Sequence, residues 1–147
     1  MSNILITGTN RGIGLELARQ LHLRGDNVIA TCRKTSHELN DLGVKVIENV
    51  DISSGHSITK LKTHLRDITL DCLIHNAGIS QYNSFDELDP DSIKRQFDVN
   101  ALSPLCMTRS LISFFNRRSK IAFVTSRMGS IGDNTSGGSY GYRMSKV

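Results

Sequence analysis

The sequence is poor in the residues that mark several classes of protein. It has no tryptophan, two prolines and three cysteines among 147 residues, and aromatic residues make up 5% of it. Cys32, Cys72 and Cys106 are widely spaced and contain no CxxC pair, so they indicate neither a disulfide framework nor a zinc site. The five histidines form no HExxH or comparable ligand pair, and we therefore predict no metal site.

Long apolar runs and a strong charge imbalance are also missing. The longest apolar stretches, such as residues 121–124, are too short to cross a bilayer, and no secretory signal pattern opens the chain. The formal net charge is only +4, and with aromatic residues so scarce the basic clusters at 60–66 and 117–120 are interpreted as solvated faces. We expect a cytoplasmic protein with no membrane or nucleic-acid partner.

Short apolar runs alternate with helical patterns along the whole chain. The runs predict five strands, at residues 3–7, 27–32, 45–50, 70–75 and 120–125. Helical patterns lie between successive runs, and strands separated by helices favour parallel βαβ units with right-handed crossovers. The sequence thus predicts an α/β fold with a doubly wound, Rossmann-like parallel sheet, in one domain over residues 1–147.

Two of the predicted helices carry specific signals. Thr35 and Glu38 have capping-box spacing before a short helix that ends near Gly43. A longer helix starts at Asp89-Pro90 and is expected to kink at Pro104, which cannot donate a backbone hydrogen bond. Its predicted apolar stripe is Ile93, Phe97, Ala101, Leu105, Ile112 and Phe115.

A glycine-rich turn joins the first strand to the first helix, at the end of the sheet where such folds bind ligands. Backbone N–H groups and the positive end of a helix would lie there beside a diphosphate. The residues of this turn that we expect to bind a cofactor are Gly8, Asn10, Arg11, Gly12, Ile13 and Gly14. The spacing is G-x-x-x-G-x-G rather than the G-x-G-x-x-G dinucleotide fingerprint, so the turn alone could also be a tight connection.

The end of the second strand should select the cofactor. An acidic residue there would hold the ribose 2′-hydroxyl of NAD, whereas a cation would hold the 2′-phosphate of NADP. The segment reads Thr-Cys-Arg-Lys, with no carboxylate before Glu38, and Arg33 with Arg11 could pair with a phosphate. NADP is therefore favoured over NAD, although both arginines could be ordinary surface residues.

A tyrosine and a lysine lie one helical turn apart near the end of the chain. Tyr142 and Lys146 would share one helix face, and a neighbouring ammonium favours the phenolate form of a tyrosine. Such a pair suits a proton donor and acceptor for a carbonyl or an alcohol. Tyr140 has no such partner because position 144 is methionine.

These motifs follow one another in the order found in the short-chain dehydrogenases/reductases, and the chain resembles that family over its whole length. The matching features are Gly8-x-x-x-Gly12-x-Gly14, Asp51-Ile52, Asn76-Ala77-Gly78, Asn100, Ser126 and Tyr142-x-x-x-Lys146. The stretch at residues 126–131, with Tyr142-Arg143, is most similar to the branch with C-factor and sniffer-type carbonyl reductases. The resemblance implies hydride transfer between a nicotinamide and the carbon of a small carbonyl or alcohol.

The resemblance also implies a role for each matching residue. Tyr142 would be the acid/base, and Lys146 would tune it and bind the nicotinamide ribose, so both would also contact the cofactor. Ser126 would polarise the substrate oxygen, and Asn100 would anchor a water molecule. Asp51 and Ile52 would contact the adenine, and Asn76, Ala77 and Gly78 would lie along the cofactor. Asp51 could instead be a capping residue, and either asparagine could be structural.

Two points leave alternatives open. Ser126 lies 16 positions before Tyr142 and Ser130 lies 12 before it, so Ser130 is a rival for the catalytic serine; Ser126 is favoured because it directly follows the predicted strand. Family members continue beyond the position of Val147, which implies a domain that is incomplete after its fifth strand. A non-catalytic nucleotide-binding or interaction module is therefore the alternative function, and a homo-oligomer is neither required nor excluded.

Overall fold

The computed structural model describes residues 1–133 and 135–147, and their contacts divide into two compact units. The sheet unit consists of Met1–Ala77 and Met107–Val124, and the helical unit of Gly78–Cys106 and Thr125–Val147. Within the described residues, no helix combines the length and the apolar character needed to span a membrane.

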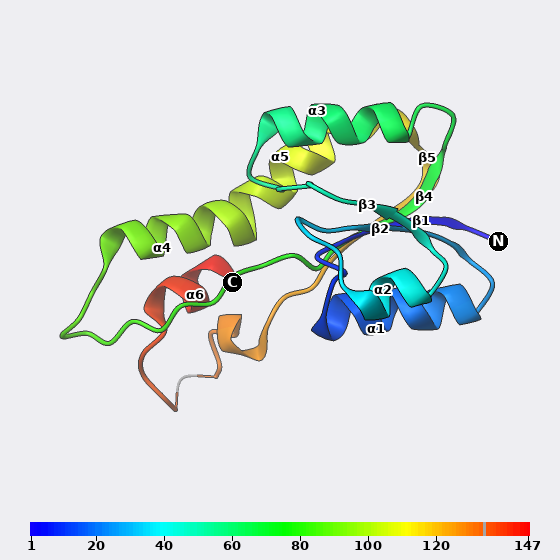
Figure 1. The fold of residues 1–147 in the computed structure, drawn as a ribbon. Helices are drawn as coiled ribbons and strands as arrows, with labels where there is room; N and C mark the ends of the chain where they lie inside the picture. The colour runs from blue at the N-terminus through cyan, green and yellow to red at the C-terminus, as the bar shows by residue number, and fades with distance from the viewer. Residues whose placement is uncertain (134) are drawn as a thin grey trace. The chain divides into compact units, whose positions relative to one another are not determined.

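The sheet unit is built on five parallel strands in the order β3-β2-β1-β4-β5. The strands are β1 (Asn3–Thr7), β2 (Asn27–Thr31), β3 (Lys45–Ile47), β4 (Leu70–His75) and β5 (Phe115–Phe123). Helices α1 (Gly12–Leu23) and α2 (His37–Asp41) lie on one face, and α3 (Gly55–His64) on the other (Figure 1). The predicted doubly wound parallel sheet is thus confirmed, and the strand order reverses at β1, which lies between β2 and β4.

The core of the sheet unit explains why its strands read as continuous apolar runs. β1 and β2 are covered on both faces, so consecutive side chains such as Leu5 and Ile6 are both fully buried. Leu73 on β4 and Ile29 on β2 extend the same core to either side. β5 is the outer strand beside β4, and Phe123 near its end is 55% exposed.

Some predicted boundaries were wrong, and the reason lies in hydrogen bonding that local patterns do not show. β5 begins at Phe115, which had been assigned to a helix, and a bulge lets Leu70 pair with Phe115 while Cys72 pairs with Lys120. β2 and β3 end earlier than predicted, at Thr31 and Ile47.

The predicted capping box at Thr35 was also wrong. Ser36 caps α2, because its hydroxyl oxygen accepts a hydrogen bond from the Leu39 N–H at 3.2 Å. The Thr35 N–H instead donates to the carboxylate of Glu48 at 2.6 Å. Glu48 follows β3, so the group that binds Thr35 in place of the predicted capping partner comes from beyond the neighbouring strand and not from the local sequence.

The helical unit contains α4 (Pro90–Phe97), a π turn η1 (Asp98–Leu102), the start of α5 (Ser103–Ser110), a 3₁₀ turn η3 (Arg127–Gly129) and α6 (Tyr140–Ser145). Between α5 and β5, a second 3₁₀ turn, η2 (Ile112–Phe114), belongs to the sheet unit. The irregularity predicted at Pro104 takes the form of the π turn. Proline has no N–H for the carbonyl four residues earlier, that of Asn100, so the regular α ladder is interrupted there.

The apolar stripe predicted for the long helix was wrong in phase. Phe97 and Leu105, which the stripe placed in the core, are 53% and 64% exposed. Besides Pro104, the buried positions on this stretch of the helical unit are the polar residues Ser92, Gln96, Asn100 and Ser103. They tolerate burial because they are hydrogen-bonded: Gln96 accepts from the Gln81 N–H at 2.9 Å and donates to Asn83 and Ser92.

Candidate active site

The glycine turn after β1 is held in place by backbone contacts within the sheet unit. Gly8 has φ +71°, and its N–H donates to the Thr31 carbonyl at 2.9 Å. A Cβ on Gly8 would lie 2.8 Å from Ala77 Cα, and a Cβ on Gly14 would collide with the Gly8 carbonyl and the Asn76 amide. Both positions therefore require glycine for close packing of the turn.

Asn76 and Ala77 tie the end of β4 to this turn. The Asn76 side-chain amide donates to the carbonyls of Thr7 and Gly8 at 3.1 and 3.0 Å. The Thr7 hydroxyl accepts from the backbone N–H groups of Asn76 and Ala77 at 3.1 and 3.0 Å. The structure thus brings together the turn and the Asn76-Ala77 pair, and it gives Asn76 a structural task beside its predicted cofactor contact.

The start of α1 has the features of an anion site. Arg11 occupies the N-cap position with an extended backbone, and the first turn has no acidic residue; within the part of the chain that the structure describes, no side chain caps the helix. Gly12 has φ +56°, and beyond its chain neighbours and its own helix no atom of the described residues lies within 4 Å of a Cβ built on it; Ile13 is 64% exposed. The first N–H groups of α1 and the positive end of its dipole can therefore receive a phosphate.

At the end of β2 the sequence analysis missed one charged group. Arg33 and Lys34 are exposed, as a site for a 2′-phosphate requires, but the Glu48 carboxylate also lies here, on the Thr35 N–H. Burial, and next the charge of Glu48, raise the pKa of the neighbouring Cys32 thiol. Only the pairing of β2 with β3 brings Glu48 to this point, so no local signal could have found it.

Asp51 and Ile52 follow β3, and both are engaged within the sheet unit. An Asp51 carboxylate oxygen accepts from the Ser53 N–H and hydroxyl at 2.9 and 2.7 Å, whereas Ser54 provides the N-cap of α3. Ile52 is buried. Asp51 is thus not the capping residue of that helix, and its adenine contact stays a prediction.

In the helical unit, three residues from separate segments converge. Lys146 Nζ lies 6.0 Å from the centroid of the Tyr142 ring. A Cβ on Gly78 would lie 3.3 Å from Lys146 Nζ and 3.0 Å from Asn100 Oδ1. Gly78 therefore allows the lysine and the asparagine to approach the same point, and burial lowers the pKa of the Lys146 ammonium.

The Asn100 side chain is fully occupied by protein groups. Its amide donates to the Ile79 carbonyl at 2.8 Å and to the Ser145 hydroxyl at 2.9 Å, and its oxygen accepts from the Ile79 N–H at 2.8 Å. Ser145 in turn donates to the Tyr142 carbonyl at 2.8 Å. Ser145, buried inside the Tyr-x-x-Ser-Lys stretch, is a residue that the sequence analysis overlooked.

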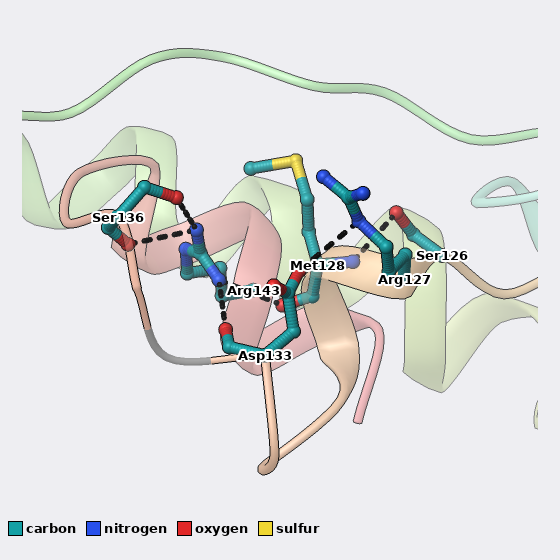
Figure 2. Close-up of polar contacts among 6 residues, drawn as sticks. All are labelled: Ser126, Arg127, Met128, Asp133, Ser136 and Arg143. Atoms are coloured by element: carbon teal, nitrogen blue, oxygen red, sulfur yellow. Dashed lines mark hydrogen bonds and ion pairs between the residues drawn. The ribbon is translucent and has the colours of Figure 1, made fainter.

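Ser126 is the N-cap residue of the 3₁₀ turn η3. Its hydroxyl oxygen accepts from the Met128 N–H at 3.2 Å, so its own proton can be donated elsewhere (Figure 2). Ser126 is half-buried and Ser130 is exposed. The segment around Ser126 contacts the end of α6, because the Thr125 hydroxyl donates to the Lys146 carbonyl at 2.6 Å.

The matches to known proteins show which family carries these features. The model described as short chain dehydrogenase matches residues 2–147. The chain belongs to the short-chain dehydrogenase family. Among relatives of this short-chain dehydrogenase is 1-hydroxy-2-glutathionyl-2-methyl-3-butene dehydrogenase of Rhodococcus sp. (strain AD45), at 40% identity over 149 residues. The match covers 100% of this chain and 66% of that protein.

Two further matches extend this assignment. The chain is 42% identical to C-signal of Myxococcus xanthus over 81 residues, which are 53% of this chain and 49% of that protein. Its fold is similar to that of a carbonyl reductase from Pseudomonas aeruginosa PAO1 crystallised in complex with NADP, with a TM-score of 0.91 and 31% identity. That match covers 99% of this chain and 70% of the reductase. The chain thus spans less than two thirds of either sequence relative.

Proposed function

We propose that this short-chain dehydrogenase is an NADP-dependent oxidoreductase that interconverts a small carbonyl compound and its alcohol in the cytoplasm. The observation that carries the proposal is the convergence of Gly78, Asn100, Tyr142 and Lys146 in the helical unit. It supports a tyrosine acid/base with a partly desolvated lysine beside it, which is the chemistry that carbonyl reduction requires.

The sheet unit fits a dinucleotide phosphate. The open space at Gly12, the uncapped start of α1 and the exposed Arg11 form a cradle for a diphosphate. Arg33 and Lys34 supply the positive charge that a 2′-phosphate needs, and Glu48 opposes it only in part because its carboxylate is bonded to the Thr35 N–H. The NADP complex of the Pseudomonas reductase supports the same choice.

When bound, the nicotinamide would supply or accept the hydride. Tyr142 would donate the phenolic proton to the carbonyl oxygen during reduction and take it back during oxidation. Lys146 would stabilise the phenolate and bind the nicotinamide ribose, and Ser126 would donate its free proton to hold the substrate oxygen.

Asn100 would contribute its backbone oxygen rather than its side chain. The side-chain amide is committed to Ile79 and Ser145, whereas Pro104, four residues on, cannot donate to the Asn100 carbonyl. The carbonyl oxygen therefore fits the predicted contact to a proton-relay water, and the side chain positions the segment that carries Tyr142.

The test is turnover of a carbonyl panel with NADPH by the wild type and by Tyr142→Phe. Loss of the phenolic proton should reduce kcat by about 10³-fold, within the range of general acid catalysis. The panel should include simple aldehydes and, because of the Rhodococcus relative, an aldehyde bearing a glutathionyl group. Equal kcat in both proteins would refute the role of Tyr142.

Nucleotide binding without turnover is the second function. The hydrogen bonds given above for the glycine turn come from residues of the sheet unit, so the shape of the turn does not depend on the tyrosine. Tight NADPH binding by a protein that turns over no member of the panel would favour this module over the enzyme.

A further inference from the structure

Arg143, which directly follows Tyr142, has a contact set that no part of the proposed reaction uses. Its guanidinium donates to four backbone carbonyls and one hydroxyl of the segment before α6. Figure 2 shows its contacts with Met128, Asp133 and Ser136. The acceptors are Met128 O at 3.4 Å, Asp133 O at 3.2 Å, Ser136 O and Oγ at 2.9 and 3.0 Å, and Gly138 O at 3.1 Å.

The segment that these bonds hold has little apolar material of its own. Residues 126–133 contain two serines and two glycines, and their branched apolar residue, Ile131, is 87% exposed. Backbone carbonyls in such a segment need a donor, and a guanidinium offers five N–H groups in a rigid fork. Arg143 thus fixes by hydrogen bonds what hydrophobic packing does not.

The hydrogen bonds of Arg143 reach the turn η3, which directly follows Ser126. The Ser126 hydroxyl accepts from the Met128 N–H, and the Met128 carbonyl accepts from Arg143. A second point of the turn is fixed at Gly129, where a side chain would overlap the Lys146 carbonyl. An ion pair between Arg127 and Asp133 at 3.2 Å closes the segment beyond the turn.

We infer that Arg143 is the positioning residue for the catalytic serine: its guanidinium holds the turn η3 to α6, which carries Tyr142 and is followed by Lys146, and so orients the Ser126 hydroxyl. The inference rests on the proposed function. This role also explains why an arginine directly follows the tyrosine. Both residues lie on α6, so a guanidinium at position 143 keeps the turn η3 at a fixed place relative to Tyr142.

Arg143→Lys keeps the positive charge at this position but removes the planar set of guanidinium N–H donors. A lysine ammonium has three donors at one point and cannot span the carbonyls of residues 128, 133, 136 and 138. We expect kcat to fall about 100-fold, the effect of a misplacement of about 1 Å, while the Kd for NADPH stays unchanged. Arg95→Lys on α4, an exposed arginine of the same unit, is the matched control and should retain wild-type kcat.

A double-mutant cycle tests whether Arg143 acts through Ser126. In a Ser126→Ala background, Arg143→Lys should cause almost no further loss of kcat, because there is no hydroxyl left to aim. In a Ser130→Ala background it should still cause the full loss. Equal losses of kcat in the wild-type and Ser126→Ala backgrounds would overturn the inference.

Trypsin cleavage after Arg127 tests the positioning without any turnover. Arg143→Lys should speed this cleavage about tenfold over the Arg95→Lys control, because the turn opens more often. If no carbonyl is reduced by the wild type, the proposed function fails while this measurement still decides the role of Arg143. A cleavage rate equal to that of the control would overturn it.

Discussion

The sheet unit and the helical unit place their site residues by different kinds of interaction. In the sheet unit, the glycine turn lies on strands whose side chains form an apolar core, and its close contacts are between backbones. In the helical unit, the corresponding positions are set by buried polar side chains, namely Gln96, Asn100 and Ser145, and by the fork of Arg143. Apolar packing tolerates many substitutions, whereas a buried polar network fails when one partner is lost.

The largest expected effect comes from a methyl group at Gly14. Gly14→Ala would drive a Cβ into the Gly8 carbonyl and the Asn76 amide, and neither backbone nor amide can move without opening the turn. We expect loss of measurable NADPH binding and a decrease of about 3 kcal/mol in the free energy of unfolding. Calorimetric titration and urea unfolding measure the two effects. Gly12→Ala, where there is open space but φ is +56°, is the control and should cost less.

Acid should destabilise the sheet unit through one buried histidine. His75 is 3% exposed, and burial lowers its pKa to about 4 from an ordinary value of 6.5. Its Nε2 lies 2.8 Å from the Thr108 hydroxyl, and its Nδ1 has no hydrogen-bond partner among the described residues. The unfolded chain therefore binds a proton more tightly than the folded one, and stability falls as the pH drops from about 6.5 toward 4.

The expected loss from His75 is about 3 kcal/mol between pH 7 and pH 4. His75→Gln, which cannot take up a proton in this range, should lack that part of the loss. Urea unfolding of both proteins at several pH values measures the difference. Parallel pH profiles for the two proteins would contradict the assignment.

A test of the polar network in the helical unit is Gln96→Leu. Leucine has a similar size and is apolar, so it would be tolerated if packing held this unit as it holds the sheet. Instead the Gln81 N–H and Asn83 lose their partner, and we expect a loss of about 2 kcal/mol in the free energy of unfolding. Ile29→Leu in the sheet core is the matched apolar change and should cost less. A larger loss of unfolding free energy for Ile29→Leu than for Gln96→Leu would contradict the view that polar hydrogen bonds hold the helical unit.

The smallest expected effect concerns cofactor choice. Arg33→Ala removes a cation from the end of β2 and should weaken NADPH binding about tenfold while leaving NADH binding unchanged. Glu48→Gln should act in the opposite direction on NADPH, because it removes the opposing charge. Calorimetric titration of both variants with both nucleotides distinguishes these outcomes. An equal loss for NADPH and NADH in Arg33→Ala would refute its selective role.

The contrast between the units also explains what the sequence could predict. β1 and β4 were predicted to the residue, because both are mainly apolar runs at the centre of the sheet. The phase of the helix through Gln96 and Asn100 could not be predicted, because its buried side is polar and its apolar residue Phe97 is exposed. The periodicity of apolar residues identifies a helix face that is buried by hydrophobic packing, but it does not identify a face that is buried through hydrogen bonds.

The residues of the candidate site likewise fall into those that the sequence could predict and those that it could not. Tyr142, Lys146 and the glycine turn were found from spacing, because each motif follows from local chain geometry. Ser145 and Glu48 were not found, because their roles depend on partners 45 and 13 residues away. The interactions of Arg143 likewise join one side chain to several points of a segment that has no periodic pattern.

Whether the sheet unit of this short-chain dehydrogenase is an NADP site can be measured by calorimetric titration of the protein with NADPH, with NADH in parallel. We expect saturable binding of both nucleotides, with the lower Kd for NADPH. Equal affinity would contradict the selection of the 2′-phosphate by Arg33. Binding of neither nucleotide would contradict the assignment of the glycine turn and the start of α1 as a cofactor site.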